Sequence, residues 1–421
     1  MNPHRQLQRR LGVFDATSIG LGSMLGAGVF VVFSPAAGLV GQFLVLAVLL
    51  AAAVAYCNAV ASAELAARYP ASGGTYVYGR QRLGEWPGFL AGWGFVSGKS
   101  ASCAAMALTF GHYVAPDYAV PVAVAAVVSL TAVNLFGITR TALLTRVLLC
   151  FVVAVLLFVA VAAFVGPHPT GAGAGDGGPG AGGTAAGGLG GVLPAAGLMF
   201  FAFAGYARIA TLGEEVKDPA RTIPRAILAA LGAAFVIYLG LALLLQNHLP
   251  AGRLASTDGP LLDAVLHSRL AAGAPLVQGG AAAASLGALL ALITGVGRTT
   301  LAMARERDLP AALAKVGGQH TVPFVAELAV AAVVILLLLT TDVMTVVGFS
   351  SFGVLIYYAV TNAAAFTLKK HPPHAPRWLN VAGFGGCLLL AFTLPPASVL
   401  GMAAVLAAGV AVRFLVVRLR R

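Results

Sequence analysis

Gly22-Ser23-Met24-Leu25-Gly26-Ala27-Gly28-Val29-Phe30 sets three glycines inside an apolar run that extends from about residue 13 to residue 39. A run of this length predicts a membrane-spanning helix, because about 20 apolar residues cross the hydrocarbon core of a bilayer. Glycine weakens a helix interior, so the run also predicts a break at its centre. Irregular backbone at membrane depth requires surrounding protein or a water-filled cavity. The stretch therefore predicts a substrate site.

The composition predicts a polytopic, all-α membrane protein embedded in a lipid bilayer. Of the 421 residues, 59% are hydrophobic and only 10% are charged, which excludes an ordinary soluble globule and a disordered chain. The four cysteines lie in apolar runs without metal-ligand spacing. We therefore expect no disulfide framework, no metal site and no cofactor.

Apolar runs long enough to cross a membrane predict about 12 transmembrane helices. They cover residues 13–39, 42–66, 87–113, 119–137, 143–165, 192–211, 225–247, 276–303, 323–340, 344–368, 377–394 and 397–417. The predicted organisation is a cytoplasmic tail at 1–12, a five-helix unit at 13–165, a Gly/Ala-rich extracellular loop at 166–191, a second five-helix unit at 192–368, and two further helices with a basic C-terminus at 369–421.

The basic residues predict the orientation. An even number of helices places both termini on one side, and all Lys and Arg residues except Lys99, Arg208, Arg253 and Arg269 then fall in segments on that side. Basic loops mark the cytoplasmic face, so we expect both termini in the cytoplasm and the chain in the cytoplasmic (plasma) membrane. This topology explains the net charge of +12 without a nucleic-acid partner. The pattern does not indicate an oligomeric state.

A second interruption occurs five helices after the first. Phe200-Phe201-Ala202-Phe203-Ala204-Gly205-Tyr206 places small residues and a glycine inside the sixth apolar run. Interrupted segments at matching positions of two halves predict a 5+5 inverted repeat with discontinuous helices 1 and 6 and a site between them. The alternative is that Gly22, Gly26 and Gly28 only allow close helix packing.

Exposed backbone at two such breaks suits a zwitterion. Amide N–H groups at a half-helix N-terminus favour a carboxylate, whereas freed carbonyl groups favour an ammonium group. An amino acid presents both groups. The breaks therefore predict recognition of the part that all amino acids share.

Four stretches resemble the amino acid-polyamine-organocation (APC) superfamily of permeases, and most closely its cationic amino acid transporter branch. The stretches are residues 22–30, 200–206, 213–227 and 298–310. In the family, Glu214, Glu215, Lys217 and Arg221 belong to a cytoplasmic loop. We expect them to form a charged cluster before a helix that starts at Thr222-Ile223-Pro224.

The resemblance also implies a substrate site. The N–H groups of Ala27 and Gly28 would receive the carboxylate, and the carbonyl groups of Met24, Phe201 and Ala204 would receive the ammonium group. Phe201 or Phe203 would cover the substrate side chain, unless both only pack between helices. The implied substrate-binding residues are Met24, Gly26, Ala27, Gly28, Phe201, Ala202, Phe203 and Ala204.

Three further residues are candidates for coupling or for lining the site. Relatives often carry an acidic residue where this chain has Ala207 followed by Arg208, which weakens the case for a strictly cationic substrate. Lys99 lies within the third run, where it would carry a coupling proton or replace a sodium ion. The alternatives for Lys99 are a static ion pair with Glu64 and a snorkelling side chain. Ser285, in the eighth run, is a candidate oxygen ligand for a sodium ion, so sodium coupling stays an alternative.

Together these features predict secondary active transport of amino acids by alternating access, coupled to protons as a symporter. An exchanger and an exporter are the alternatives, followed by a non-transporting sensor or a channel. The chain is not expected to be an enzyme, because its histidines lie mostly in loops and its intramembrane acids are isolated.

Overall fold

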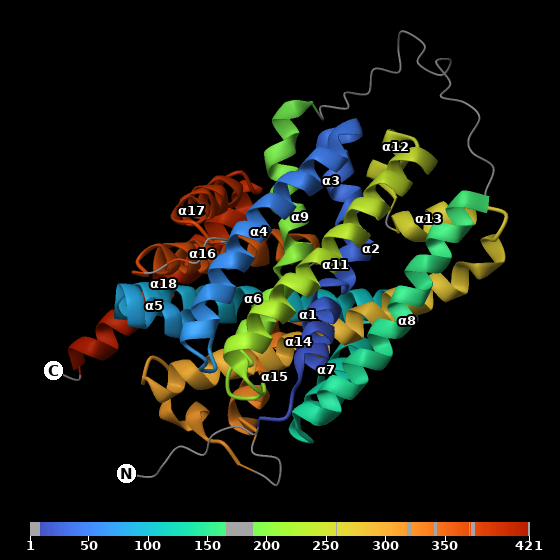
Figure 1. The fold of residues 1–421 in the computed structure, drawn as a ribbon. Helices are drawn as coiled ribbons and strands as arrows, with labels where there is room; N and C mark the ends of the chain where they lie inside the picture. The colour runs from blue at the N-terminus through green and yellow to red at the C-terminus, as the bar shows by residue number, and fades with distance from the viewer. Residues whose placement is uncertain are drawn as a thin grey trace.

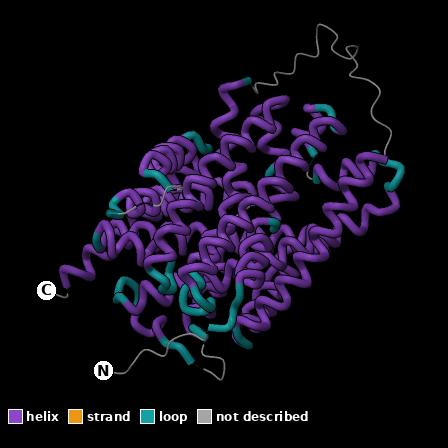
Figure 2. The backbone as a smooth tube through the Cα atoms, in the orientation of Figure 1, coloured by secondary structure: helices purple, strands orange, loops and turns teal. Residues whose placement is uncertain are grey.

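A computed structural model describes residues 9–165, 188–257, 259–317, 322–340, 343–369, 371 and 375–419. Throughout these residues the secondary structure is helical and contains no β-strand (Figure 2). The predicted all-α class is therefore confirmed. The tail at residues 1–8 and most of the Gly/Ala-rich loop, residues 166–187, lie outside the described residues.

The helices follow one another along the whole chain. The first part contains α1 (Val13–Met24), α2 (Ala27–Val31), α3 (Phe33–Val40), α4 (Leu44–Arg68), α5 (Thr75–Leu83), α6 (Glu85–Val114), α7 (Ala119–Leu135) and α8 (Ile138–Val165). The second part contains α9 (Val192–Phe203), α10 (Ala207–Ala210), α11 (Pro219–His248), α12 (Ala251–Ser256), α13 (Pro260–Leu266), α14 (Ala274–Arg305), α15 (Phe324–Leu338), α16 (Val343–Phe366), α17 (Arg377–Phe392) and α18 (Pro396–Leu419).

Each of the twelve predicted stretches overlaps a helix. Within the described ranges, 9 helical segments are long and apolar enough to cross a membrane. Two more, α15 and α17, are apolar but shorter. The remaining one, α6, has 30 residues and packs against α14 and α16, so many of its small and polar residues face protein rather than lipid. The protein is thus an integral membrane protein.

The two interrupted helices lie at the centre of the bundle. Figure 1 shows the start of α1 at the bottom of the view and α3, the start of α9 and α12 at the top. The helices α4, α9 and α11 pack side by side, and α1 packs against α11 and α14. The breaks in both helices are therefore enclosed by protein, which is where irregular backbone is tolerated in a membrane.

The predicted helix start at Thr222-Ile223-Pro224 is wrong. The helix α11 begins at Pro219, directly after Asp218, whose φ of 44° turns the chain into the helix. Proline is favoured at a first helical position because its missing N–H would have no partner there. Pro224 only removes a bond to the carbonyl of Ala220, a residue that is exposed. The short helices α5, α12 and α13 were also not predicted.

Candidate functional site

The predicted break in the first membrane helix is present. The helix α1 ends at Met24, Gly26 has extended backbone with φ −77° and ψ −154°, and α2 begins at Ala27. The N–H groups of Ala27 and Gly28 therefore belong to a first helical turn, where no earlier turn of the same helix supplies carbonyl partners.

The second interruption is milder than predicted. The helix α9 ends at Phe203, and Ala204–Tyr206 form a single 3₁₀ turn before α10. The N–H of Ala204 donates to the carbonyls of Phe200 and Phe201. The carbonyl of Phe201 is therefore already hydrogen-bonded, although a carbonyl oxygen can accept a second bond.

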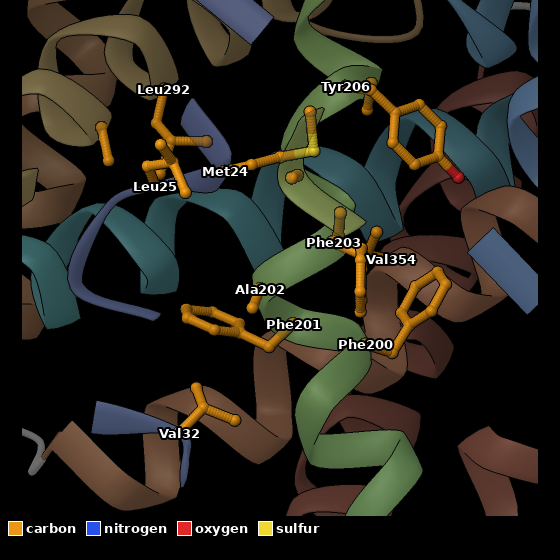
Figure 3. Packing of buried hydrophobic residues seen from close by; sticks show 14 of the residues in the cluster. Met24, Leu25, Val32, Phe200, Phe201, Ala202, Phe203, Tyr206, Leu292 and Val354 are labelled. Carbon is orange, nitrogen blue, oxygen red and sulfur yellow. The ribbon is translucent and has the colours of Figure 1, made fainter. Parts of the chain in front are cut away.

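The two interruptions touch each other. A methyl group on Gly205 would lie 2.6 Å from the amide nitrogen of Met24, and one on Gly28 would lie 3.3 Å from Cα of Ala202 and 3.6 Å from Cδ1 of Phe201. Figure 3 shows the side chain of Met24 extending toward the helix that carries Phe201, Ala202 and Phe203. The fold thus brings the predicted site residues together from two distant parts of the chain.

Glycine packing is also real at this break. A methyl group on Gly26 would overlap Cβ of Ala288 in α14, and one on Gly22 would lie 2.9 Å from Cγ2 of Thr145 in α8. The packing alternative and the site hypothesis are therefore compatible, because close packing of α1 against its neighbours positions the break.

Tyr238 of α11 is a site residue that the sequence did not reveal. Its hydroxyl donates to the carbonyl of Met24 at 2.6 Å and also contacts the carbonyl of Ala202 at 3.3 Å. Its ring meets that of Phe203 edge to face, with 4.9 Å between centroids. A single tyrosine in the apolar centre of α11 was the available signal, since a buried hydroxyl needs a partner.

Lys99 lies beside the site and makes no ion pair with Glu64. The ammonium group is 5.8 Å from the ring centroid of Phe201, and the residue is only 3% exposed, which excludes snorkelling. The alternative of an ion pair with Glu64 is wrong, because Glu64 pairs with Arg68 at 3.2 Å and contacts His371 at 3.4 Å. No ion pair of Lys99 occurs within the described part of the chain.

Ser285 and Arg208 have different surroundings. The hydroxyl of Ser285 donates to the carbonyl of Ala281 in its own helix at 2.9 Å. Arg208 is buried in α10, outside the Met24–Gly205 contact, and donates to Oγ1 of Thr211 at 2.7 Å. No group of three or more His, Cys, Asp or Glu residues suited to a metal ion occurs among the residues that the structure describes.

One residue of the predicted cytoplasmic loop, Glu215, belongs to a buried cluster of charged side chains. Arg298 lies inside α14, within the predicted run 276–303, and it binds Glu215 through Nε at 3.1 Å and Nη2 at 2.7 Å. Its Nη1 donates to Glu327 of α15. The expected charged cluster at the cytoplasmic face is wrong for Glu215, which is buried, whereas Lys217 and Arg221 are exposed. Glu215 can be buried because an arginine held between two carboxylates compensates their charge.

Apolar helices with two interrupted segments in contact are the architecture of a membrane transporter. The chain belongs to the amino acid permease family, part of the APC superfamily: the family described as "Amino acid permease" matches residues 11–416. The family and its named members are transporters and not enzymes. The predicted superfamily and the predicted non-enzymatic role are confirmed.

Three relatives illustrate the range of the family. The uncharacterized transporter Rv1999c of Mycobacterium tuberculosis is 56% identical over 406 residues, which cover 96% of this chain and 91% of that protein. The branched-chain amino acid permease BcaP of Bacillus subtilis is 27% identical over 415 residues, which cover 90% of this chain and 85% of that protein. The chloroplastic cationic amino acid transporter 7 of Arabidopsis thaliana is 27% identical over 384 residues, which cover 86% of this chain and 66% of that protein.

Proposed function

We propose that this permease is a secondary active transporter that carries an amino acid with an uncharged side chain across the cytoplasmic membrane by alternating access. The observation that carries the proposal is the contact between Met24 and Gly205, because it joins the two interrupted helices at one point. Transporters with this organisation bind substrate between such segments.

Backbone groups supply the recognition of the amino and carboxyl groups. The first-turn N–H groups of Ala27 and Gly28 take the carboxylate, and the carbonyls of Met24, Phe201 and Ala204 take the ammonium group. The Tyr238 hydroxyl occupies one acceptor position of the Met24 carbonyl. A substrate ammonium group either shares that carbonyl or displaces the hydroxyl.

The charge beside the site favours an uncharged substrate side chain. The Lys99 ammonium group lies over the ring of Phe201, the aromatic proposed to cover the substrate. Like charges repel strongly at membrane depth, so a cationic side chain next to Phe201 is disfavoured. Ala207 adds no carboxylate to offset this repulsion. BcaP, a relative named as a branched-chain amino acid permease, agrees with an uncharged side chain.

Lys99 is the proposed carrier of the coupling proton in a symport mechanism. It is buried, adjoins the site and has no ion-pair partner in the described ranges. A buried lysine releases its proton far more readily than an exposed one. An exchanger would use the same site without net proton movement.

The membrane organisation is proposed from charge and helix pattern. Twelve crossings, cytoplasmic termini and two inverted five-helix units at 13–165 and 192–368 together explain the distribution of basic residues. In this arrangement the discontinuous first and sixth helices move against the surrounding helices.

Uptake into proteoliposomes tests the proposal. A panel of radiolabelled neutral, cationic and acidic amino acids is assayed with and without pH and sodium gradients. We expect uptake of at least one neutral amino acid, driven by an inward proton gradient. Absence of flux and of exchange for every amino acid would refute transport, whereas uptake restricted to cationic amino acids would refute the proposed selectivity.

A further inference from the structure

Four buried charged side chains lie near one another where α10 and the turn after it meet α14 and α15. They are Arg208, Glu215, Arg298 and Glu327, with exposed fractions of 1%, 2%, 1% and 0%. Two arginines and two glutamates make the cluster neutral. Burial of four charges is costly unless each is compensated, so the way in which they pair matters for any movement of these helices.

The four charges divide equally between two parts of the fold. Arg208 and Glu215 belong to the segment that leaves the 3₁₀ turn of the sixth helix, whereas Arg298 and Glu327 belong to α14 and α15. Arg298 binds Glu327 on its own side and Glu215 across the boundary. Each of the two parts therefore contributes one arginine and one glutamate to the cluster. The charges that each part contributes sum to zero.

The N-terminal segment is tied to the same part as Glu215. The N–H groups of Arg10 and Leu11 donate to the carbonyl of Glu215 at 2.8 and 3.0 Å, and the N–H of Lys217 donates to the carbonyl of Leu11 at 2.8 Å. The residues just before α1 and the turn that follows α10 are thus held together. The bidentate bond from Arg298 to Glu215 then clamps both interrupted helices to α14.

Arg208 has hydrogen-bonding capacity that this arrangement leaves unused. Its Nη1 donates to Thr211, but Nε and Nη2 are buried without any hydrogen-bond partner, as is Oε2 of Glu327. Buried guanidinium donors are normally satisfied, so an arginine in this state calls for a partner in another arrangement. Glu215, on the same segment, is seven residues further along the chain.

We propose that this cluster is the gate on the side where α1 begins, and that Arg208 takes over Glu215 when Arg298 releases it. After release, Arg298 keeps Glu327 and Arg208 receives Glu215. The gate opens without leaving a carboxylate unpaired at membrane depth, because each half is self-neutralising. This inference rests on the proposed alternating access, and the proposed topology places this side of the protein in the cytoplasm.

Amide hydrogen exchange of residues 211–218 tests the gate without requiring transport. Arg298→Gln removes the clamp and is expected to speed exchange of this segment. Arg208→Gln removes the partner of the open state and is expected to slow it, by at least about threefold relative to the unmodified protein. If Arg208 only stabilises the fold, both variants speed exchange, and that result would overturn the proposal.

Transport and binding supply a second measurement. In Arg208→Gln we expect equilibrium amino acid binding to be retained while uptake falls at least about tenfold, since Glu215 is stranded on opening. The double variant Arg208→Gln with Glu215→Gln removes both charges of the mobile half and is expected to recover uptake relative to the single variant. If uptake does not recover in the double variant, the proposed transfer of Glu215 from Arg298 to Arg208 is contradicted. If the unmodified chain shows no uptake, the proposed function fails. The gate is still tested in that case, because the faster amide exchange expected in Arg298→Gln and the slower exchange expected in Arg208→Gln do not depend on transport.

Discussion

The hydroxyl of Tyr238 donates a hydrogen bond of 2.6 Å to the carbonyl of Met24, the last residue of α1 before its break. The same hydroxyl contacts the carbonyl of Ala202 in α9 at 3.3 Å. One side chain from α11 therefore links the backbones of both interrupted helices. Tyr238 holds the proposed site together at the carbonyl that the substrate ammonium group is expected to use.

Tyr238→Phe tests this link. Loss of the hydroxyl leaves the Met24 carbonyl without its donor, so we expect a loss of about 1–2 kcal/mol in stability. A bound ammonium group replaces the missing donor, so the thermal shift caused by saturating amino acid should exceed that of the unmodified protein. Tyr56→Phe, at an exposed position of α4, is the matched control and should change neither value. Equal ligand shifts in both proteins contradict the role of the Met24 carbonyl.

Gly205→Ala tests the contact between the two breaks. The added methyl group would lie 2.6 Å from the Met24 nitrogen, so we expect destabilisation of about 1–3 kcal/mol and loss of amino acid binding. The control is Gly232→Ala in α11, where no atom lies within 4 Å. There a methyl group should be neutral or stabilise by about 0.5–1 kcal/mol. Thermal unfolding and equilibrium binding measure both, and full binding by Gly205→Ala would remove this contact from the site.

Lys99→Met tests proton coupling. The methionine fills similar space but carries no proton, so uptake by the variant should lose its dependence on an inward pH gradient while exchange of amino acid persists. Lys217→Met, at an exposed position before α11, is the control and should keep the dependence. Uptake is followed in proteoliposomes at equal internal and external pH and with an imposed gradient. An unchanged gradient dependence in Lys99→Met excludes it as the proton carrier.

Asp308→Asn tests how the last helix is anchored. The carboxylate of Asp308 is almost fully buried and accepts hydrogen bonds from Arg80 at 3.0 Å and from Arg413 of α18 at 2.8 Å. In the variant the two arginines lose their buried shared counter-charge and retain Glu85, which is exposed. We therefore expect a loss of about 3–5 kcal/mol and faster amide exchange in α18. Glu306→Gln, half exposed beside Arg80, should cost about 0–1 kcal/mol. Equal effects of the two substitutions would show that Asp308 does not anchor α18.

Tyr76 makes the stability of the region around Asp308 sensitive to alkaline pH. Burial, together with a 2.7 Å hydrogen bond donated to Asp308, holds the pKa of the Tyr76 hydroxyl well above its usual range. A raised folded-state pKa contributes stability that is full below about pH 10 and is lost as the pH rises further. Tyr76→Phe should therefore show a smaller fall in thermal midpoint above about pH 10 than the unmodified protein. Tyr118→Phe, at an exposed tyrosine, should leave the fall unchanged.

The sequence by itself determined the helical membrane class, a break within the stretch Gly22 to Phe30 and the place of the second interruption. Apolar run length and glycine position act locally, so they can be recognised without knowing which helices are neighbours. Only the tertiary structure decided the partners. The contacts of Tyr238 with Met24 and of Arg298 with Glu215 and Glu327 join helices that are distant in sequence. Lys99 likewise adjoins Phe201 rather than Glu64. The energy of a buried charge or hydroxyl depends on what surrounds it, and only the packed bundle specifies those surroundings.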